Sequence, residues 1–271
     1  MHALRLWPAD ERRQVVGVFT DIDDTLTTAG SITPDALEAL GRLHQAGLPV
    51  IAVTGRPVGW SEPFARAWPV DAIVAENGSV ALVLQGGRVS RRYLQDAAIR
   101  AANFSRMQQV AARVVREVPG AVLSQDSAGR ETDIAIDHSE FTHLPQHAID
   151  HAVRIMQAEG MSATVSSIHI NGWFGTHNKL VGARWIVQAL WGRALDAELA
   201  QWVYVGDSTN DQLMFEAFGN SIGVANIRRF VPELTHLPRY VTEGERGAGF
   251  AEVVQALLSV PGGRARAAAC A

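Results

Sequence analysis

The chain has 271 residues, 47% of them hydrophobic, which is enough for one large domain or two modest ones with a sizeable core. Its formal net charge of −4 argues against a nucleic-acid partner and an anionic membrane surface, and no apolar run is long enough to cross a bilayer. The only cysteine, Cys270, lies beside the C-terminus, which excludes an internal disulfide. The N-terminus lacks the apolar core of a signal peptide, so we expect a cytoplasmic protein.

The first feature along the chain is a short apolar run, Val15 to Phe19, followed closely by Asp21, Asp23 and Asp24. Its length and β-branched residues predict a buried strand. In a parallel α/β sheet, ligands bind where the strands end. Carboxylates this close together repel one another unless a cation or a shared proton relieves them, and Mg²⁺ is the natural candidate. The alternative is that these residues form only a solvated turn.

The next segments alternate between helix and strand. Thr33 and Pro34 predict a helix start, and Gly47 predicts its end. A second apolar strand, Pro49 to Val53, is followed by polar or flexible residues, namely Thr54, Gly55 and Arg56. Another helix and a third strand, Ala72 to Ala75, complete the pattern. This order predicts an α/β fold with a Rossmann-like, doubly wound parallel sheet.

The pattern changes after the third strand. A hairpin signal surrounds Gly86 and Gly87, and the segments that follow mix helices with antiparallel-looking strands. We therefore predict an inserted α+β domain at residues 81–172, within a core formed by residues 1–80 and 173–260. Residues 261–271 are rich in Gly, Arg and Ala, and we expect a disordered tail there.

The 24 basic residues include a single lysine, Lys179. An ammonium is a compact point charge, whereas a guanidinium is a wide planar fork, so a tight phosphate or carboxylate pocket would favour this choice. The alternative is that one lysine remains by chance. Farther along, the apolar strand Trp202 to Val205 ends in the polar sequence Gly206 to Asp211.

Together these clusters resemble the four motifs of the haloacid dehalogenase superfamily. Asp21 to Thr25 matches Asp-x-Asp-x-Thr, Thr54 and Lys179 match the second and third motifs, and Gly206 to Asp211 matches Gly-Asp-x-x-x-Asp. The long segment between Thr54 and Lys179 is similar in position to the α+β cap of subfamily IIB, which includes Cof-type, sucrose-phosphate and mannosyl-3-phosphoglycerate phosphatases.

The resemblance implies a Mg²⁺-dependent phosphatase of phosphate monoesters, with small phosphorylated molecules such as sugar phosphates as substrates. Asp21 would be the nucleophile that forms an aspartyl-phosphate, and Asp23 the general acid and base. The implied metal ligands are Asp21, the main-chain carbonyl of Asp23, and Asp207. The implied phosphate contacts are Thr54, Gly55, Arg56, Lys179 and Asn210, with Asp211 orienting Lys179 or a metal-bound water. Charge neutralisation of this kind is what phosphoryl transfer requires.

Most relatives have Gly where this chain has Asp24; we expect that carboxylate to face away from the site and cap the following turn. Residues before Lys179, including Trp173 and His177, could contact substrate or simply pack a hinge. A phosphomannomutase-like phosphomutase and a non-catalytic binding protein are the alternative functions. We expect a monomer or a dimer.

Overall fold

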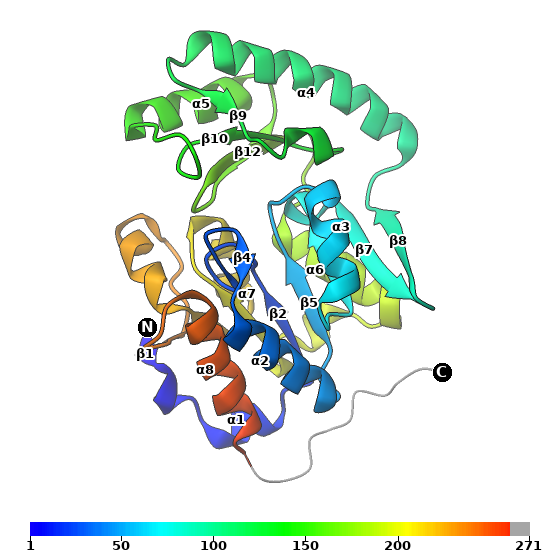
Figure 1. Cartoon of the computed structure of the whole chain (residues 1–271), viewed down its shortest axis with the longest axis vertical. Coiled ribbons are helices and arrows are strands. Elements are labelled where there is room, and N and C mark those ends of the chain that lie inside the picture. Colours follow the sequence, from blue (N-terminus) through cyan, green and yellow to red (C-terminus); the bar gives the residue numbers. More distant parts are fainter. Residues whose placement is uncertain (261–271) are drawn as a thin grey trace.

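The computed structural model describes residues 1–260, and the tail expected to be disordered lies outside the described residues (Figure 1). The chain forms a nine-stranded sheet in the order β1-β15-β14-β13-β2-β5-β6-β7-β8. Its strands are β1 (His2–Ala3), β2 (Gly17–Thr20), β5 (Val50–Val53), β6 (Ala72–Ala75), β7 (Val80–Gln85), β8 (Arg88–Tyr93), β13 (Trp202–Gly206), β14 (Asn220–Gly223) and β15 (Tyr240–Val241). All neighbours from β1 through β6 are parallel, which confirms the predicted α/β fold.

Helices cover both faces of this sheet, and its central strands are therefore fully buried. On one face, Val18 and Val50 pack into a core shared with Leu40 and Phe250. That face carries α2 (Pro34–Gln45), α3 (Val58–Ala67) and α8 (Arg246–Leu258), with the short α1 (Ala9–Arg13) near the N-terminus. The other face carries α6 (Lys179–Trp191) and α7 (Gln212–Ala217). Side chains alternate between the two faces along each strand, as the period of two requires.

A second, antiparallel sheet has the order β11-β12-β10-β9. Its strands are β9 (Val122–Leu123), β10 (Ile134–Asp137), β11 (Ser162–Val165) and β12 (His169–Trp173). Two helices, α4 (Ala97–Glu117) and α5 (Gln146–Ala158), pack on it around a core of their own. Figure 1 shows both helices on the face that points away from the nine-stranded sheet. We call residues 97–173 the inserted unit.

The hairpin β7–β8 differs from the prediction. We expected it inside the inserted domain, but β7 pairs antiparallel with β6, for example Val74 with Ala81, and so extends the nine-stranded sheet. The boundary predicted at residue 81 is therefore wrong. The physical reason is that β6 would otherwise present an unpaired edge beside the buried residues of its strand.

Two short pairs complete the architecture. Strand β1 lies parallel to β15, an edge pairing that the sequence did not indicate. A two-stranded ribbon, β3 (Thr27–Thr28) with β4 (Ser31–Ile32), follows the first aspartates and stands beside them. Within residues 1–260, no helix combines the length and the apolar character that a membrane span requires.

Candidate active site

The predicted catalytic residues converge at the carboxyl ends of the central strands. Asp21 follows β2, Thr54 follows β5, and Asp207 follows β13, while Lys179 is the first residue of α6. All of these side chains are buried. Lys179 Nζ donates hydrogen bonds to Oδ1 of Asp21 and to Oδ1 of Asp211, both at 2.7 Å. The chain therefore places one ammonium between two carboxylates.

Asp211 is held rigidly in this position. One of its oxygens, Oδ2, accepts hydrogen bonds from the main-chain N–H groups of Asp207, at 2.9 Å, and Ser208, at 3.1 Å. The other, Oδ1, accepts from the hydroxyl of Tyr204 as well as from Lys179. Asn210 is near, with its Oδ1 3.3 Å from Lys179 Nζ. This geometry supports the expected orienting role of Asp211, and it leaves Asp211 few free lone pairs.

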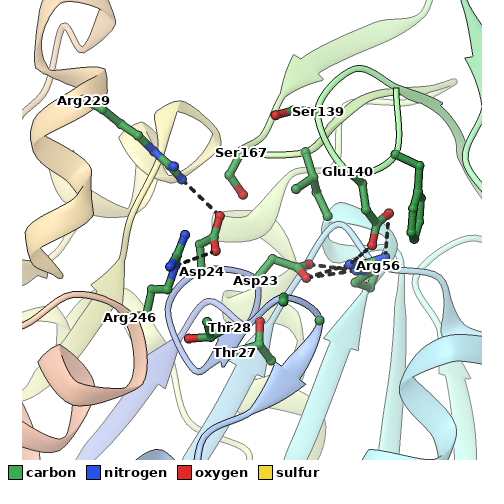
Figure 2. Close-up of a pocket in the computed structure, with 14 residues that line it drawn as sticks. Asp23, Asp24, Thr27, Thr28, Arg56, Ser139, Glu140, Ser167, Arg229 and Arg246 are labelled. Atoms are coloured by element: carbon green, nitrogen blue, oxygen red, sulfur yellow. Dashed lines mark hydrogen bonds and ion pairs between the residues drawn. The ribbon is translucent and has the colours of Figure 1, made fainter. Parts of the chain in front are cut away.

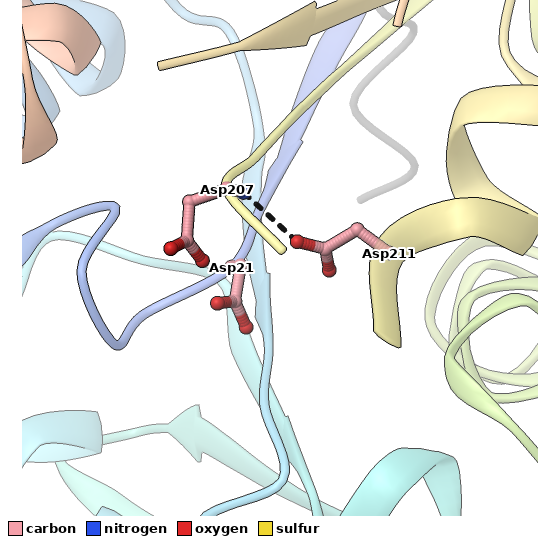
Figure 3. A group of neighbouring side chains, drawn as sticks. All are labelled: Asp21, Asp207 and Asp211. Atoms are coloured by element: carbon pink, nitrogen blue, oxygen red, sulfur yellow. Dashed lines mark hydrogen bonds between the residues drawn. The ribbon is translucent and has the colours of Figure 1, made fainter. Parts of the chain in front are cut away.

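Three carboxylates meet beside this lysine. Ligand oxygens of Asp21, Asp207 and Asp211 all lie within 4.8 Å of one another (Figure 3). Among the described residues, Oδ1 of Asp207 is buried without a hydrogen-bond partner. A buried carboxylate oxygen without a hydrogen-bond partner is energetically costly unless a bound cation or another donor satisfies it. Hard oxygen donors with excess negative charge are the ligands that Mg²⁺ prefers, so Asp21 and Asp207 fit a magnesium site.

The electrostatics lead to the same conclusion. Burial raises the pKa of Asp21 to about 7, opposed by Lys179 and reinforced by the charges of Asp211 and Asp23. Burial and the neighbouring Asp21 also raise the pKa of Asp207 well above its ordinary value. Without another cation, this cluster therefore favours protonated carboxyls, because a single ammonium cannot compensate three buried carboxylates. A divalent cation would neutralise the remaining negative charge of these carboxylates.

The second motif is positioned by main-chain contacts. The hydroxyl of Thr54, which is fully buried, accepts a hydrogen bond from the N–H of Arg56 at 3.0 Å. The carbonyl of Gly55 accepts one from Arg130 of the inserted unit at 2.9 Å. A Cβ at Gly55 would lie 3.3 Å from the side-chain oxygens of Asn171 and Asn77, so the position favours glycine. The turn is thus fixed between the two sheets.

Arg56 links the nine-stranded sheet to the inserted unit. Its Nε lies 3.0 Å from both carboxylate oxygens of Asp23. Its two Nη atoms donate to Glu140 at 2.7 Å and to Asp126 at 3.1 Å, both in the inserted unit. The guanidinium is therefore occupied by carboxylates, and the expected contact between Arg56 and phosphate stays a prediction.

A cavity of about 380 Å³ opens between the two parts of the chain. Figure 2 shows its charged lining, which comprises Asp23, Asp24, Arg56, Glu140, Arg229 and Arg246. Asp24 pairs here with Arg229 at 3.0 Å and Arg246 at 2.9 Å. The expectation that Asp24 faces away is therefore wrong. Its backbone has a φ of 54°, a conformation that aspartate tolerates, and its carbonyl accepts from Asn226, so its carboxylate lies against the two arginines.

The inserted unit contributes one loop to this cavity. The carboxylate of Asp137, at the end of β10, accepts hydrogen bonds from the four main-chain N–H groups of residues 139–142, at 2.9 to 3.1 Å. The side chains of Ser139, Glu140 and Phe141 thereby line the cavity. Asp137 is buried, so the loop has a fixed anchor.

Sequence reasoning missed several residues of the site. They are Tyr204, Asp137, Glu140, Asn226, Arg229 and Arg246. A usable signal existed for Asn226, because the strand-like run Ser221 to Ala225 comes directly before it, and ligands bind where such strands end. Its side chain donates to Oδ2 of Asp207 at 3.0 Å. No comparable pattern marked Arg229 or Arg246.

Comparison with known proteins agrees with this geometry. A family model described as haloacid dehalogenase-like hydrolase matches residues 18–167, more than half of the chain. A phosphoglycolate phosphatase of Methanothermobacter thermautotrophicus is 29% identical over 247 residues, which cover 89% of this chain and 98% of the relative.

Two solved structures share the fold. A protein of Thermoplasma acidophilum has a TM-score of 0.69 at 15% identity, with 90% of this chain and 98% of that chain covered. A sucrose-phosphatase of Synechocystis has a TM-score of 0.64 at 16% identity, with the same coverage of 90% and 98%. These neighbours agree with the predicted resemblance to subfamily IIB. The chain therefore belongs to the haloacid dehalogenase-like hydrolases and is an enzyme of the phosphatase type.

Proposed function

We propose that this enzyme is a Mg²⁺-dependent phosphatase that hydrolyses phosphate monoesters of small metabolites through an aspartyl-phosphate. The observation that carries the proposal is the buried Asp21, which lies 2.7 Å from Lys179 and beside the unpaired oxygen of Asp207. A nucleophilic carboxylate, a fixed ammonium and an incomplete oxygen ligand set are the parts that phosphoryl transfer needs.

In the first step, a carboxylate oxygen of Asp21 attacks phosphorus, and the bond between phosphorus and the substrate oxygen breaks. Asp23 gives its proton to that leaving oxygen, so an alcohol departs. Arg56 keeps Asp23 in place through its Nε, 3.0 Å from both carboxylate oxygens. Lys179 neutralises Asp21 and the phosphoryl oxygens, and Asp211 keeps Lys179 aligned.

In the second step, Asp23 removes a proton from water as its oxygen attacks phosphorus. The bond between phosphorus and Asp21 breaks, which releases phosphate and regenerates the carboxylate. Mg²⁺ held by Asp21, Asp207 and the main-chain carbonyl of Asp23 would supply positive charge beside the phosphoryl group. Thr54, Gly55 and Asn210 are the proposed phosphate contacts.

The relatives and the cavity support the proposed substrate class. One relative is named a phosphoglycolate phosphatase, and one structural neighbour is named a sucrose-phosphatase. A cavity of about 380 Å³ is of the size that small-molecule sites occupy. Small phosphorylated metabolites, sugar phosphates among them, are therefore the proposed substrates, and the inserted unit acts as the cap that selects among them.

The test is phosphate release from a panel of small phosphate monoesters, measured with Mg²⁺ and with excess chelator. We expect release that chelation abolishes and that Mg²⁺ restores. Asp21→Asn should lower kcat by about 10⁴-fold or more, because an amide cannot act as the nucleophile. Asp10→Asn, at an exposed position, is the matched control and should leave kcat unchanged. Chelator-resistant release, or turnover by Asp21→Asn, would contradict the proposal; isomerised substrate without free phosphate would indicate a mutase.

A further inference from the structure

One wall of the cavity carries two guanidinium groups, those of Arg229 and Arg246. Arg246 Nε lies 2.9 Å from Oδ1 of Asp24, and an Nη of Arg229 lies 3.0 Å from Oδ2 of the same residue. Two guanidinium groups thus contact the carboxylate of Asp24, and Arg229 also lies near Asp207. Their side chains are 34% and 45% exposed, whereas the side chain of Arg56 is only 5% exposed. The pair therefore faces the open space of the cavity.

The opposite wall carries more negative than positive charge. There the single guanidinium of Arg56 is shared by Asp23, Asp126 and Glu140. Figure 2 shows Arg229 and Arg246 approaching Asp24 on one side, with Arg56 and Glu140 on the other. The cavity is consequently polarised, and an anion entering it would be attracted toward the wall that carries Arg229 and Arg246.

These two arginines also keep unused donors. A guanidinium has five N–H donors in a planar fork, a geometry that matches a carboxylate. Within residues 1–260, Arg246 uses only its Nε and Arg229 uses only one Nη in side-chain hydrogen bonds. Both residues line the cavity, so their remaining N–H groups can reach a bound molecule.

The position of the pair limits the length of that molecule. The same Nη of Arg229 lies 3.6 Å from Oδ2 of Asp207, and Asp207 is one of the carboxylates clustered around Asp21. A group bound by the two arginines would therefore be close to the phosphoryl group on which Asp21 acts. A substrate whose second anionic group lies close to its phosphate could contact both sites at once.

We propose that Arg229 and Arg246 bind a carboxylate of the substrate, so that the preferred substrate is a short phosphorylated carboxylic acid. Asp24 positions the two guanidinium groups and reduces the repulsion between them. The proposal rests on the proposed phosphatase function and deepens it, because it adds a second anionic group to the substrate. It also gives a role to Asp24, which occupies the unspecified position of the first motif.

The test compares kcat/KM within two matched substrate pairs that differ only by a carboxylate in place of a hydroxymethyl group. The pairs are 3-phosphoglycerate with glycerol 3-phosphate, and 2-phosphoglycerate with glycerol 2-phosphate. The wild-type enzyme should prefer the acid by at least about tenfold in one pair or both. Arg246→Gln and Arg229→Gln should each reduce that preference by about 10- to 100-fold, mainly through KM for the acid.

Arg91→Gln is the matched control. Arg91 is also 39% exposed and paired with two carboxylates, Glu62 and Glu131, but it lies outside the cavity lining. It should leave the preference unchanged. Arg246→Lys keeps the charge and should retain part of the preference, which separates binding of the anion from a general loss of structure.

Three outcomes would overturn the inference. They are a wild-type enzyme without preference for either acid, variants that lower both members of a pair equally, and a control that loses the preference as well. In each case Mg²⁺-dependent release from the neutral member leaves the phosphatase function standing. If the wild-type enzyme releases no phosphate from either pair or from p-nitrophenyl phosphate, the proposed function fails and this inference fails with it.

Discussion

Nζ of Lys179 lies 2.7 Å from Oδ1 of Asp21, although 158 positions separate the two residues in the chain. The sheet makes this contact possible, because β2 ends at the same edge where α6 begins. Burial alone would lower the pKa of Lys179, but the charges of Asp21 and Asp211 raise it above its ordinary value. The lysine therefore stays charged where it stands, 3% exposed.

This relationship predicts the effect of Lys179→Arg. A planar guanidinium is wider than an ammonium and cannot occupy the space between Asp21, Asp211 and Asn210 without displacing them. We expect kcat to fall by about 100-fold or more while the protein stays folded, as judged by steady-state kinetics and circular dichroism. The reverse exchange Arg184→Lys, at an exposed position of the same helix, is the control and should change neither. A near-normal kcat for Lys179→Arg would show that the ammonium is not required.

Glu140→Gln should loosen the contact between the inserted unit and the nine-stranded sheet. Glu140 pairs with Arg56 at 2.7 Å and with His169 at 2.8 Å, and its side chain is 19% exposed. Removing the charge of Glu140 should weaken the interaction between the two parts by about 1–3 kcal/mol. We expect faster amide hydrogen exchange in residues 139–142 and a higher KM.

Glu159→Gln is the matched control for that variant. Glu159 pairs with Arg113, and both residues lie within the inserted unit. Loss of the Glu159 charge should leave amide hydrogen exchange in residues 139–142 unchanged. Equal exchange rates in the two variants would mean that the Arg56–Glu140 pair does not hold the two parts together.

Tyr204→Phe should weaken catalysis through Asp211. The hydroxyl of Tyr204 donates to the same oxygen that Lys179 contacts. Without it we expect kcat to fall by about tenfold and the free energy of unfolding to fall by about 1 kcal/mol. Tyr93→Phe removes a hydroxyl that donates to Glu131, away from the site. That control should lower stability without lowering kcat, and a parallel loss of kcat in both variants would refute the positioning role of Tyr204.

His177→Phe should change how stability depends on pH. Burial lowers the pKa of His177 to about 4 from the ordinary value of 6.5, and the ring stacks on Trp173. Between pH 4 and 6.5 the unfolded chain therefore binds more protons than the folded one, so this residue makes stability fall as pH falls. From pH 7 to pH 5 its contribution is about 2 kcal/mol.

Urea unfolding of the wild-type protein and of His177→Phe, each at pH 7 and pH 5, measures that contribution. The loss of stability at the lower pH should be smaller in His177→Phe, because phenylalanine keeps the stacking and removes the titration. His147→Phe, at an exposed position, should leave the dependence as in the wild type. Identical pH dependence in wild type and His177→Phe would contradict the prediction.

The sequence was sufficient for the α/β fold and for predicting that the central residues of the candidate site lie at one edge of the sheet. Asp21, Thr54 and Asp207 each follow an apolar run, so the rule that ligands bind at strand ends placed them together. The hairpin at Gly86 and Gly87 was also recognised. Its partner was not, because a hairpin signal reports only the pairing of its own two strands and says nothing about the strand on its other side.

The cavity walls could not be predicted in the same way. Arg246 lies 222 positions from the aspartate it pairs with, and Arg56 lies 84 positions from Glu140. No periodic or turn pattern in the sequence identifies the residue with which an arginine in a loop forms an ion pair. Asp24 was misassigned for this reason, since the cations that hold its carboxylate come from distant segments.

The anchor at Asp137 has a consequence for how selectivity can change in this enzyme. It holds the loop through main-chain N–H groups, which every residue except proline supplies regardless of its side chain. Ser139 and Phe141 can therefore be exchanged in a combinatorial library while the backbone that carries them keeps its shape. The backbone shape of this loop and the side chains it presents to the cavity can therefore vary independently. This makes the loop a suitable starting point for directed evolution toward new substrates.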